Sequence, residues 1–210
     1  MVQLSSGITV VIPTHPARIE NGMLGRAVES VLNQQLKPSA LVVECDEDGS
    51  GAAATRDRGL RKVTTEWVAF LDSDDWFYPE HLKVLAAGAK IFNASYVFSY
   101  YMVHFPDGRP WPANDPLGHF GKQFNPKAPH QTTITTLVRT DLAKQVGFHE
   151  PPPDSVVGGH RGGEDWHFTV GCAESGAKMV HIPRRTWAWV HHGANSSGIP
   201  GRGDAAPRQA

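Results

Sequence analysis

Three short apolar runs, each followed by polar residues, constrain the fold of this chain more than any other feature. They lie at residues 8–12, 41–43 and 67–71. The segments between them, 21–37 and 52–61, read as helices from their apolar spacing or their content of helix formers. Apolar runs of this kind are typical of strands covered on both faces, and strands that alternate with helices form parallel sheets. The sequence therefore predicts a βαβαβ unit.

The second half of the chain is less regular. Strands are expected at 96–103, 132–138, 179–182 and 187–190, and helices after Pro79, at 141–146 and from Glu164 to Gly176. Two stretches rich in Pro and Gly, 105–130 and 151–163, separate these elements, and long irregular segments in compact domains are often functional. We expect residues 105–130 to form a loop on the acceptor side, and residues 198–210 a flexible tail.

Composition narrows the classes of function. A chain of 210 residues with 40% hydrophobic residues suits one domain, which we place at residues 1–197. A formal net charge of −1 provides no basic surface for nucleic acid. There is no apolar stretch long enough for a membrane span and no leader pattern, and the two cysteines form no metal or disulfide spacing. We therefore expect a cytoplasmic protein, and the oligomeric state stays open.

An acidic turn follows the third apolar run. Asp72, Asp74 and Asp75 fall within four residues, so three carboxylates should emerge at the carboxyl end of a parallel sheet. Their repulsion needs compensation, and Mg²⁺ or Mn²⁺ held by one or two carboxylates keeps coordination positions for phosphate oxygens. The turn thus predicts a site for a diphosphate. The alternative is a solvated turn that caps the next helix, with Asp75 near the helix dipole.

Several ordered segments carry a resemblance to the family-2 glycosyltransferases. The chain offers the opening strand 8–14, the turn Asp48-Gly49-Ser50, the helix segment 53–59, the acidic turn 72–75, the pair Glu164-Asp165 and the segment 189–197. The resemblance is close over residues 8–85 and weak in the middle of the chain. It implies a GT-A fold, a three-layer α/β sandwich with a mainly parallel sheet. Residues 8–104 would be the nucleotide-sugar-binding half and residues 105–197 the acceptor half.

The family resemblance also implies an activity. A metal-dependent, inverting glycosyltransferase of the hexosyltransferase type would move a sugar from a nucleoside diphosphate sugar (UDP-, GDP- or dTDP-linked) to a hydroxyl group. The acceptor would lie on a protein, a glycan or a small molecule. The sequence fixes neither the donor nor the acceptor.

Roles for the donor-binding residues follow from the same resemblance. Pro13 and Thr14 would contact the nucleobase, together with Asp46 or Glu44. The segment Glu44–Ser50 is longer than the family's usual turn, so both acids stay candidates, and we favour Asp46. The remaining nucleotide-sugar residues would be Arg56, Asp72, Ser73 and Asp74. For Arg56 the alternative is a surface ion pair with Asp57 or Glu66.

Catalytic and metal-binding roles fall on four residues, one of which, Asp74, also belongs to the donor-binding set. Asp165 is the expected base that accepts the proton of the acceptor hydroxyl, with Glu164 as its substitute. The alternative is that both are ordinary first-turn acids that complement a helix dipole. Asp74 is the expected metal ligand, joined by His192 rather than His191. A carboxylate beside an imidazole suits Mn²⁺ better than Mg²⁺.

Trp76 and Trp166 each follow an acidic pair, and an aromatic face can stack against a sugar ring. We therefore expect these two tryptophans near the acceptor or the donor sugar. Two other functions compete with glycosyl transfer. A sugar-nucleotide nucleotidyltransferase would need a Gly-rich, Lys-containing phosphate loop, and neither G-x-x-x-x-G-K-[ST] nor G-x-G-x-x-G occurs. A non-catalytic glycan-binding protein could share the fold.

Overall fold

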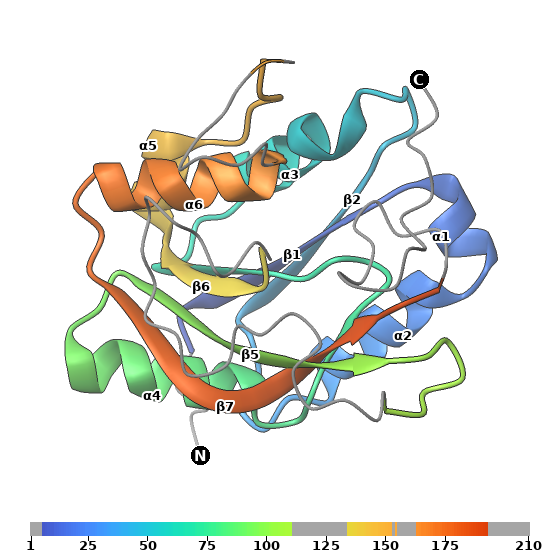
Figure 1. Cartoon of the computed structure of the whole chain (residues 1–210), viewed down its shortest axis with the longest axis horizontal. Coiled ribbons are helices and arrows are strands. Elements are labelled where there is room, and N and C mark those ends of the chain that lie inside the picture. Colours follow the sequence, from blue (N-terminus) through green and yellow to red (C-terminus); the bar gives the residue numbers. More distant parts are fainter. Residues whose placement is uncertain (1–5, 111–133, 153, 155–162, 193–210) are drawn as a thin grey trace.

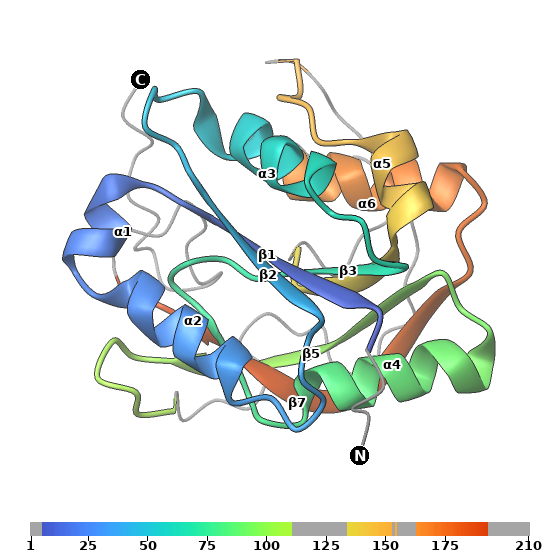
Figure 2. The same cartoon turned by 180° about the vertical axis from the view of Figure 1, so that it is seen from behind.

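The computed structural model describes residues 6–110, 134–152, 154 and 163–192. Over these residues the chain forms one seven-stranded sheet with helices on both faces (Figures 1 and 2). The strands are β1 (Ile8–Thr14), β2 (Ala40–Cys45), β3 (Trp67–Phe70), β4 (Trp76–Phe77), β5 (Tyr96–His104), β6 (Thr136–Arg139) and β7 (Met179–Val190). The helices are α1 (Pro16–Glu20), α2 (Met23–Leu32), α3 (Gly51–Arg61), α4 (His81–Phe92), α5 (Thr140–Val146) and α6 (Glu164–Glu174). None of the helices within the described ranges has the length and apolar character needed to cross a membrane.

Strand direction determines where the polar strand ends meet. The order across the sheet is β2-β1-β3-β6-β5-β7-β4. Strands β1, β2 and β3 pair in parallel, β6 runs antiparallel to both β3 and β5, and β7 is parallel to β5. Five strands therefore share one direction, while β4 and β6 run against it. The carboxyl ends of β1, β2, β3 and β7 consequently lie along one edge, as expected for an α/β sheet.

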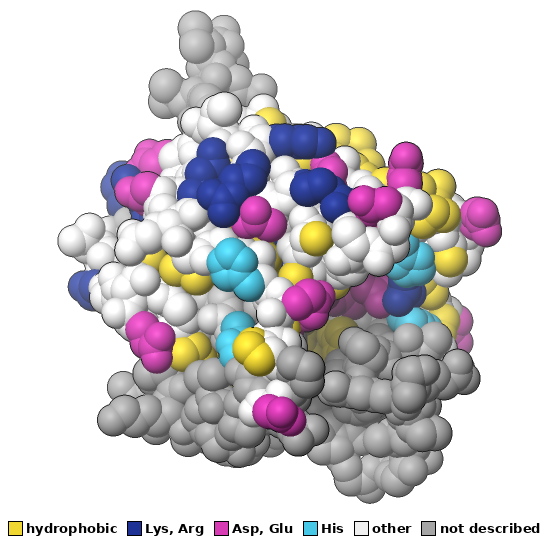
Figure 3. Space-filling model, turned by 90° about the horizontal axis from the view of Figure 1, so that it is seen from above, with side chains coloured by type: hydrophobic (Ala, Val, Ile, Leu, Met, Phe, Trp, Pro, Cys, Tyr) yellow, Lys and Arg dark blue, Asp and Glu magenta, His cyan; other side chains and the backbone are white. Residues whose placement is uncertain are grey.

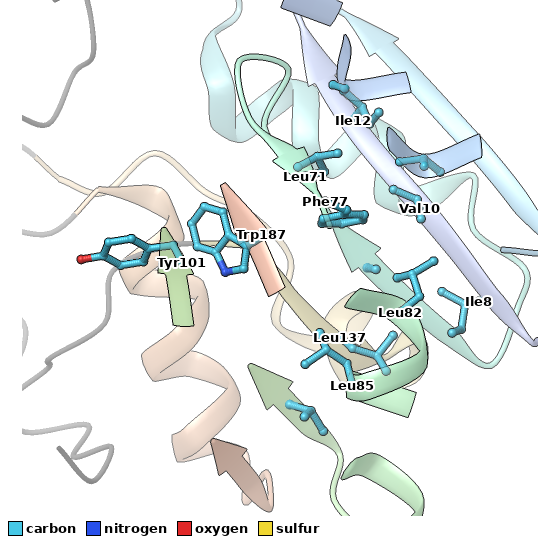
Figure 4. Packing of buried hydrophobic residues seen from close by; sticks show 14 of the residues in the cluster. Ile8, Val10, Ile12, Leu71, Phe77, Leu82, Leu85, Tyr101, Leu137 and Trp187 are labelled. Atoms are coloured by element: carbon cyan, nitrogen blue, oxygen red, sulfur yellow. The ribbon is translucent and has the colours of Figure 1, made fainter. Parts of the chain in front are cut away.

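The sheet separates two hydrophobic layers. Every residue of β1 is buried, and alternate side chains point to opposite faces. On one face Ile8 and Val10 pack with Leu82 and Leu85 of α4 (Figure 4). On the other face β1 packs with α3 and α6, where the ring of Phe168 stacks on Phe148 at 4.2 Å. Burial on both faces explains why residues 8–12 form a continuous run of β-branched side chains.

Gly59 allows helix α3 to lie close to the sheet. A Cβ atom at this position would come within 2.6 Å of Val11 Cγ1, closer than side chains tolerate. The packing density of a protein interior leaves no room to relieve such a contact cheaply. The glycine therefore fixes the distance between α3 and β1, and with it the position of the site residues on α3.

Some predicted elements differ from the structure. The expected helix over 21–37 is the shorter helix α2, which begins after Gly22 in the left-handed conformation (φ 78°), and a further helix, α1, precedes it at 16–20. Pro79 precedes α4 instead of lying in its first turn. The two last predicted strands are one strand, β7, because its pairing register shifts against β5 and accommodates Pro183 in the irregularity. Strand β4 is only two residues long and leaves no periodic signal.

Other expectations concern residues outside the described ranges. They are the tail at 198–210, most of the two irregular stretches at 105–130 and 151–163, and the beginning of the strand expected at 132–138. The part of that strand that is described, β6, begins at Thr136.

Candidate active site

A polar cleft of about 320 Å³ lies at the carboxyl edge of the sheet. Residues from the ends of β1 and β2, from α1, from α3 and from the turn after β3 line it, together with one residue of β7. They are Pro13, Thr14, His15, Arg18, Asp46, Ala52, Thr55, Arg56, Asp72, Ser73, Asp74, Asp75 and Trp189. Figure 3 shows a hollow in the molecular surface where acidic, basic and histidine side chains gather. Open α/β sheets bind their ligands at this edge.

The acidic turn brings its three carboxylates together. One ligand atom each from Asp72, Asp74 and Asp75 lies within 4.8 Å of the others. Asp75 is buried (4% exposed), and its Oδ1 accepts a hydrogen bond of 2.8 Å from the backbone N–H of Val190. Burial raises the pKa of Asp75 well above its ordinary value, and the charges of Asp74 and Asp72 raise it further. Asp75 thus ties the turn to β7, and the alternative in which it caps the next helix is not supported, because α4 has neither an acidic first-turn residue nor a side-chain cap.

Asp74 faces a histidine and an arginine. Its Oδ2 lies 3.0 Å from His192 Nε2 and 2.9 Å from Arg18 Nη2. Burial acts to raise the pKa of Asp74, but the hydrogen bond with His192 and the charge of Arg18 outweigh it and lower the pKa. The structure therefore brings together Asp74 and His192, the two predicted metal ligands, which are 118 residues apart in the sequence.

Arg56 connects the acidic turn to helix α6. Its guanidinium donates to Asp72 Oδ1 at 2.6 Å and forms a second ion pair with Glu164. Arg56 is buried (6% exposed), so a surface ion pair with Asp57 or Glu66 is wrong for this residue. Those two acids pair with Arg61 and Arg139 instead. The connection holds the start of α6 beside the carboxyl edge of the sheet.

Asp165 lies in the first turn of α6, next to this connection. Its Oδ1 accepts a hydrogen bond of 2.7 Å from the backbone N–H of Trp166. Burial, followed by the negative charge of Glu164, raises the pKa of Asp165 to about 7. Arg56 opposes this shift without cancelling it. A carboxyl group with such a pKa exchanges protons near neutral pH, as a general base must.

The two candidates for the nucleobase contact have different surroundings. Glu44 is buried (9% exposed) and is paired with Arg58 at 3.1 Å and Lys62 at 2.5 Å. Asp46 lines the cleft and accepts hydrogen bonds from the backbone N–H groups of Ser50 and Gly51 at the start of α3. The bond from Gly51 is the main cause that lowers the pKa of Asp46, to about 2. The structure therefore places Asp46, and not Glu44, at the cleft.

The two predicted stacking tryptophans are not equally accessible. Trp166 is buried (1% exposed), so its ring offers no surface to a sugar, and the prediction that it stacks on one is not supported. A residue that follows an acid at a helix start points into the core as easily as into a cleft, which the sequence pattern did not distinguish. Trp76 is partly buried, with the guanidinium of Arg26 4.9 Å from its ring centroid and His104 4.8 Å away.

Arg18 is a charged residue of the cleft that was not predicted from the sequence. It follows the end of β1 by four residues, on α1, and it contacts both Asp74 and His192. The signal that could have found it is its position, because a basic residue shortly after a strand lies at the same edge as the acidic turn. Its neighbours Thr14 and Ser73 line the same cleft, as predicted, and both are buried.

The side-chain oxygen and nitrogen atoms at this edge are of the kind that coordinate a divalent cation. Asp74 supplies a carboxylate oxygen and His192 an imidazole nitrogen, 3.0 Å apart and both at most 17% exposed. Oxygen together with imidazole nitrogen is a set that Mn²⁺ accepts more readily than Mg²⁺. The other two acids of the turn are engaged with Arg56 and with the backbone of Val190.

A second, larger cleft of about 520 Å³ lies at the opposite, amino edge of the sheet. Its lining comes from the starts of β1 and β3, the end of β6 and the end of α4. The residues are Ser6, Ile8, Glu66, Trp67, Ala86, Ala89, Lys90, Asn93, Ala94, Ser95, Leu137 and Arg139. No residue predicted from the sequence to bind a ligand lies among them.

A family model and several solved structures match this chain. The family model described as "Glycosyl transferase family 2" matches residues 36–148. No curated protein sequence matches the chain. Among solved structures, S. aureus TarS 1-349 in complex with UDP-GlcNAc is similar at 18% identity with a TM-score of 0.67, over 88% of this chain and 58% of that one. The same fragment with UDP has 17% identity and a TM-score of 0.66, over 88% and 60%. The chain thus spans less than two thirds of these TarS chains.

Proposed function

Because this chain belongs to glycosyltransferase family 2 and has the family's GT-A fold, we propose that it transfers a sugar from a nucleoside diphosphate sugar to an acceptor hydroxyl, with a divalent cation and inversion at the anomeric carbon. The observation that carries the proposal is the Arg56 bridge. It joins Asp72 of the acidic turn to Glu164, the neighbour of Asp165. A donor-binding turn and a carboxyl group with a pKa of about 7 are thereby held at one edge of the sheet.

The nucleoside would lie across the ends of β1 and β2. Pro13, Thr14 and Asp46 line that part of the cleft, and an aspartate that stays ionised accepts hydrogen bonds from a base. Similarity to TarS structures that hold UDP and UDP-GlcNAc supports a uridine nucleotide as the first donor to test. The acceptor stays open among protein, glycan and small-molecule hydroxyls.

The diphosphate would lie over the acidic turn. Asp74 and His192 would hold Mn²⁺, which neutralises the negative charge of the leaving diphosphate. Ser73 provides a hydroxyl group at the same turn and lines the cleft. Arg56 keeps Asp72 in place, so the turn retains its shape when the donor enters.

Asp165 would accept the proton of the acceptor hydroxyl. As the acceptor oxygen attacks, its bond to the anomeric carbon forms while the bond between that carbon and the diphosphate oxygen breaks. The nucleoside diphosphate leaves with the bonding electrons, and the proton goes to the Asp165 carboxylate. A single displacement of this kind inverts the anomeric centre, and a base with a pKa near the working pH is suited to it.

A panel of nucleotide-sugars tests the proposal. The full chain is incubated with UDP-, GDP- and dTDP-sugars, in Mn²⁺, in Mg²⁺ or with EDTA, and release of the nucleoside diphosphate is followed. We expect release from one donor that requires a divalent cation and is fastest with Mn²⁺. Pyrophosphate release from a nucleoside triphosphate and a sugar phosphate would point instead to a nucleotidyltransferase. Tight binding with no turnover of any donor would point to a binding protein.

A further inference from the structure

Arg18 lies beside Asp74 and His192, the two side chains that would hold the cation in the proposed function. Its Nη2 lies 2.9 Å from Asp74 Oδ2, and its Nη1 lies 2.9 Å from His192 Nε2. The same Nη1 is 2.8 Å from the sulfur of Met23. The side chains of Arg18, Asp74 and His192 are only 16%, 17% and 6% exposed. An internal cation therefore neutralises Asp74 in a site that is largely shielded from water.

These contacts compete for one ring nitrogen. His192 Nε2 lies within hydrogen-bond distance of Arg18 Nη1, which can only donate, and of Asp74 Oδ2, which accepts when ionised. A single neutral ring nitrogen satisfies one of these partners and not the other. A metal ion would use the lone pairs of both His192 and Asp74 at once. His192 Nε2 therefore cannot serve both Arg18 and Asp74, whereas a metal ion in the place of Arg18 would bind both Nε2 and Asp74 Oδ2.

His192 Nε2 has a single lone pair, so it cannot accept from Arg18 and bind a metal ion at the same time. At Asp74 Oδ2 the charges of a guanidinium and a divalent cation repel each other. Arg18 must leave Asp74 when a cation arrives. Helix α1 makes this feasible because it is five residues long, contributes no fully buried residue to the core, and is separated from α2 by Gly22 with φ 78°. Movement of Arg18 therefore breaks no hydrophobic core.

We propose that Arg18 is an exchangeable counter-ion that couples cation binding to nucleotide binding, an inference that rests on the proposed function. Without a cation, Arg18 neutralises Asp74. With the cation in place, Arg18 turns to the diphosphate, which accepts its N–H groups and replaces the partner that it lost. The cation alone displaces Arg18 at a cost, and the nucleotide offsets that cost. Binding of each ligand thus favours binding of the other.

Calorimetric titrations of the full chain separate the two roles of Arg18. In the Arg18→Gln variant we expect Mn²⁺ alone to bind about tenfold more tightly than in the wild type, because Asp74 has lost its competitor. We expect UDP in saturating Mn²⁺ to bind about tenfold more weakly, because the diphosphate has lost an N–H donor. Arg61→Gln is the matched control, since it removes the same charge from an exposed ion pair with Asp57 outside the cleft.

The two titrations distinguish failure of the inference from failure of the proposed function. If the wild type binds Mn²⁺ with UDP but Arg18→Gln binds Mn²⁺ no more tightly, the inference alone is overturned. If the wild type binds neither, both are overturned. Arg18→Lys guards against misfolding of the glutamine variant, because it keeps a cation that cannot span both partners. Its Mn²⁺ affinity should lie between those of the wild type and Arg18→Gln, and an unchanged value would count against the proposal.

Discussion

Two clefts lie at opposite edges of the same sheet, and the larger one is not the candidate active site. The amino-edge cleft measures about 520 Å³ and the carboxyl-edge cleft about 320 Å³. Among the described lining residues, the larger cleft has one carboxylate, Glu66, which pairs with Arg139, itself stacked over the ring of Trp67. The smaller cleft has four aspartates and two arginines. The charged side chains of the smaller cleft, and not the volume of the larger one, therefore identify the candidate site.

The difference follows from strand direction. Because β1, β2 and β3 run the same way, the polar residues that follow them converge at the carboxyl edge. Strand starts converge at the amino edge, and here they supply apolar residues such as Ile8. Closely spaced carboxylates need either a positive charge beside them or a raised pKa that keeps one of them protonated. Both occur at the carboxyl edge, where Arg18 pairs with Asp74 and the pKa of Asp75 is raised.

The largest effect should come from Asp165→Asn. Removal of the proposed base should lower the turnover of donor and acceptor by about 10²–10⁴-fold, the range for general base catalysis, while donor affinity stays close to that of the wild type. Single-turnover assays together with calorimetry separate the two quantities. Asp141→Asn is the control, because Asp141 is also a first-turn acid but belongs to α5. Equal turnover in both variants would mean that Asp165 only complements its helix dipole.

Asp74→Asn should have the next largest effect, on binding. Loss of the carboxylate removes the proposed ligand that Mn²⁺ shares with His192, so Mn²⁺-dependent UDP affinity should fall by about 100-fold. The measurement is UDP titration with and without Mn²⁺. Glu66→Gln makes the same kind of change at the amino edge and should leave UDP affinity unchanged. Undiminished affinity in Asp74→Asn would place the cation elsewhere.

The pH dependence should be smaller and should have a definite sign. The pKa of Asp165 is raised to about 7, and the base works only when ionised. Turnover should therefore rise with pH up to about 7, with a loss of about tenfold for each pH unit below that value. The residual turnover of Asp165→Asn should not show this rise. A wild-type profile that is flat from pH 5.5 to 7.5 would argue against Asp165 as the titrating base.

The same contrast shows what the sequence can and cannot predict. The β-branched run of β1 and the acids at 72–75 are local patterns, so the fold class and the cluster of carboxylates after β3 could be predicted. The bridge from Arg56 to Glu164 joins residues 108 positions apart, and no local pattern reports such a contact. Burial of Trp166 depends on how α6 packs, which is also set by distant residues. Long-range packing, rather than local preference, is the part that needed the structure.

The smallest effect should come from the amino edge, and it sharpens the comparison most. Arg139 is 38% exposed in its ion pair with Glu66, and exposed pairs contribute about 0–1 kcal/mol to stability. Arg139→Gln should therefore lower the melting temperature by at most about 4 °C and leave turnover within about twofold of the wild type. A matched pair of thermal melts and donor assays measures both. If turnover instead fell tenfold while the melting temperature held, the larger cleft would take part in the reaction, and charge would no longer be the better guide.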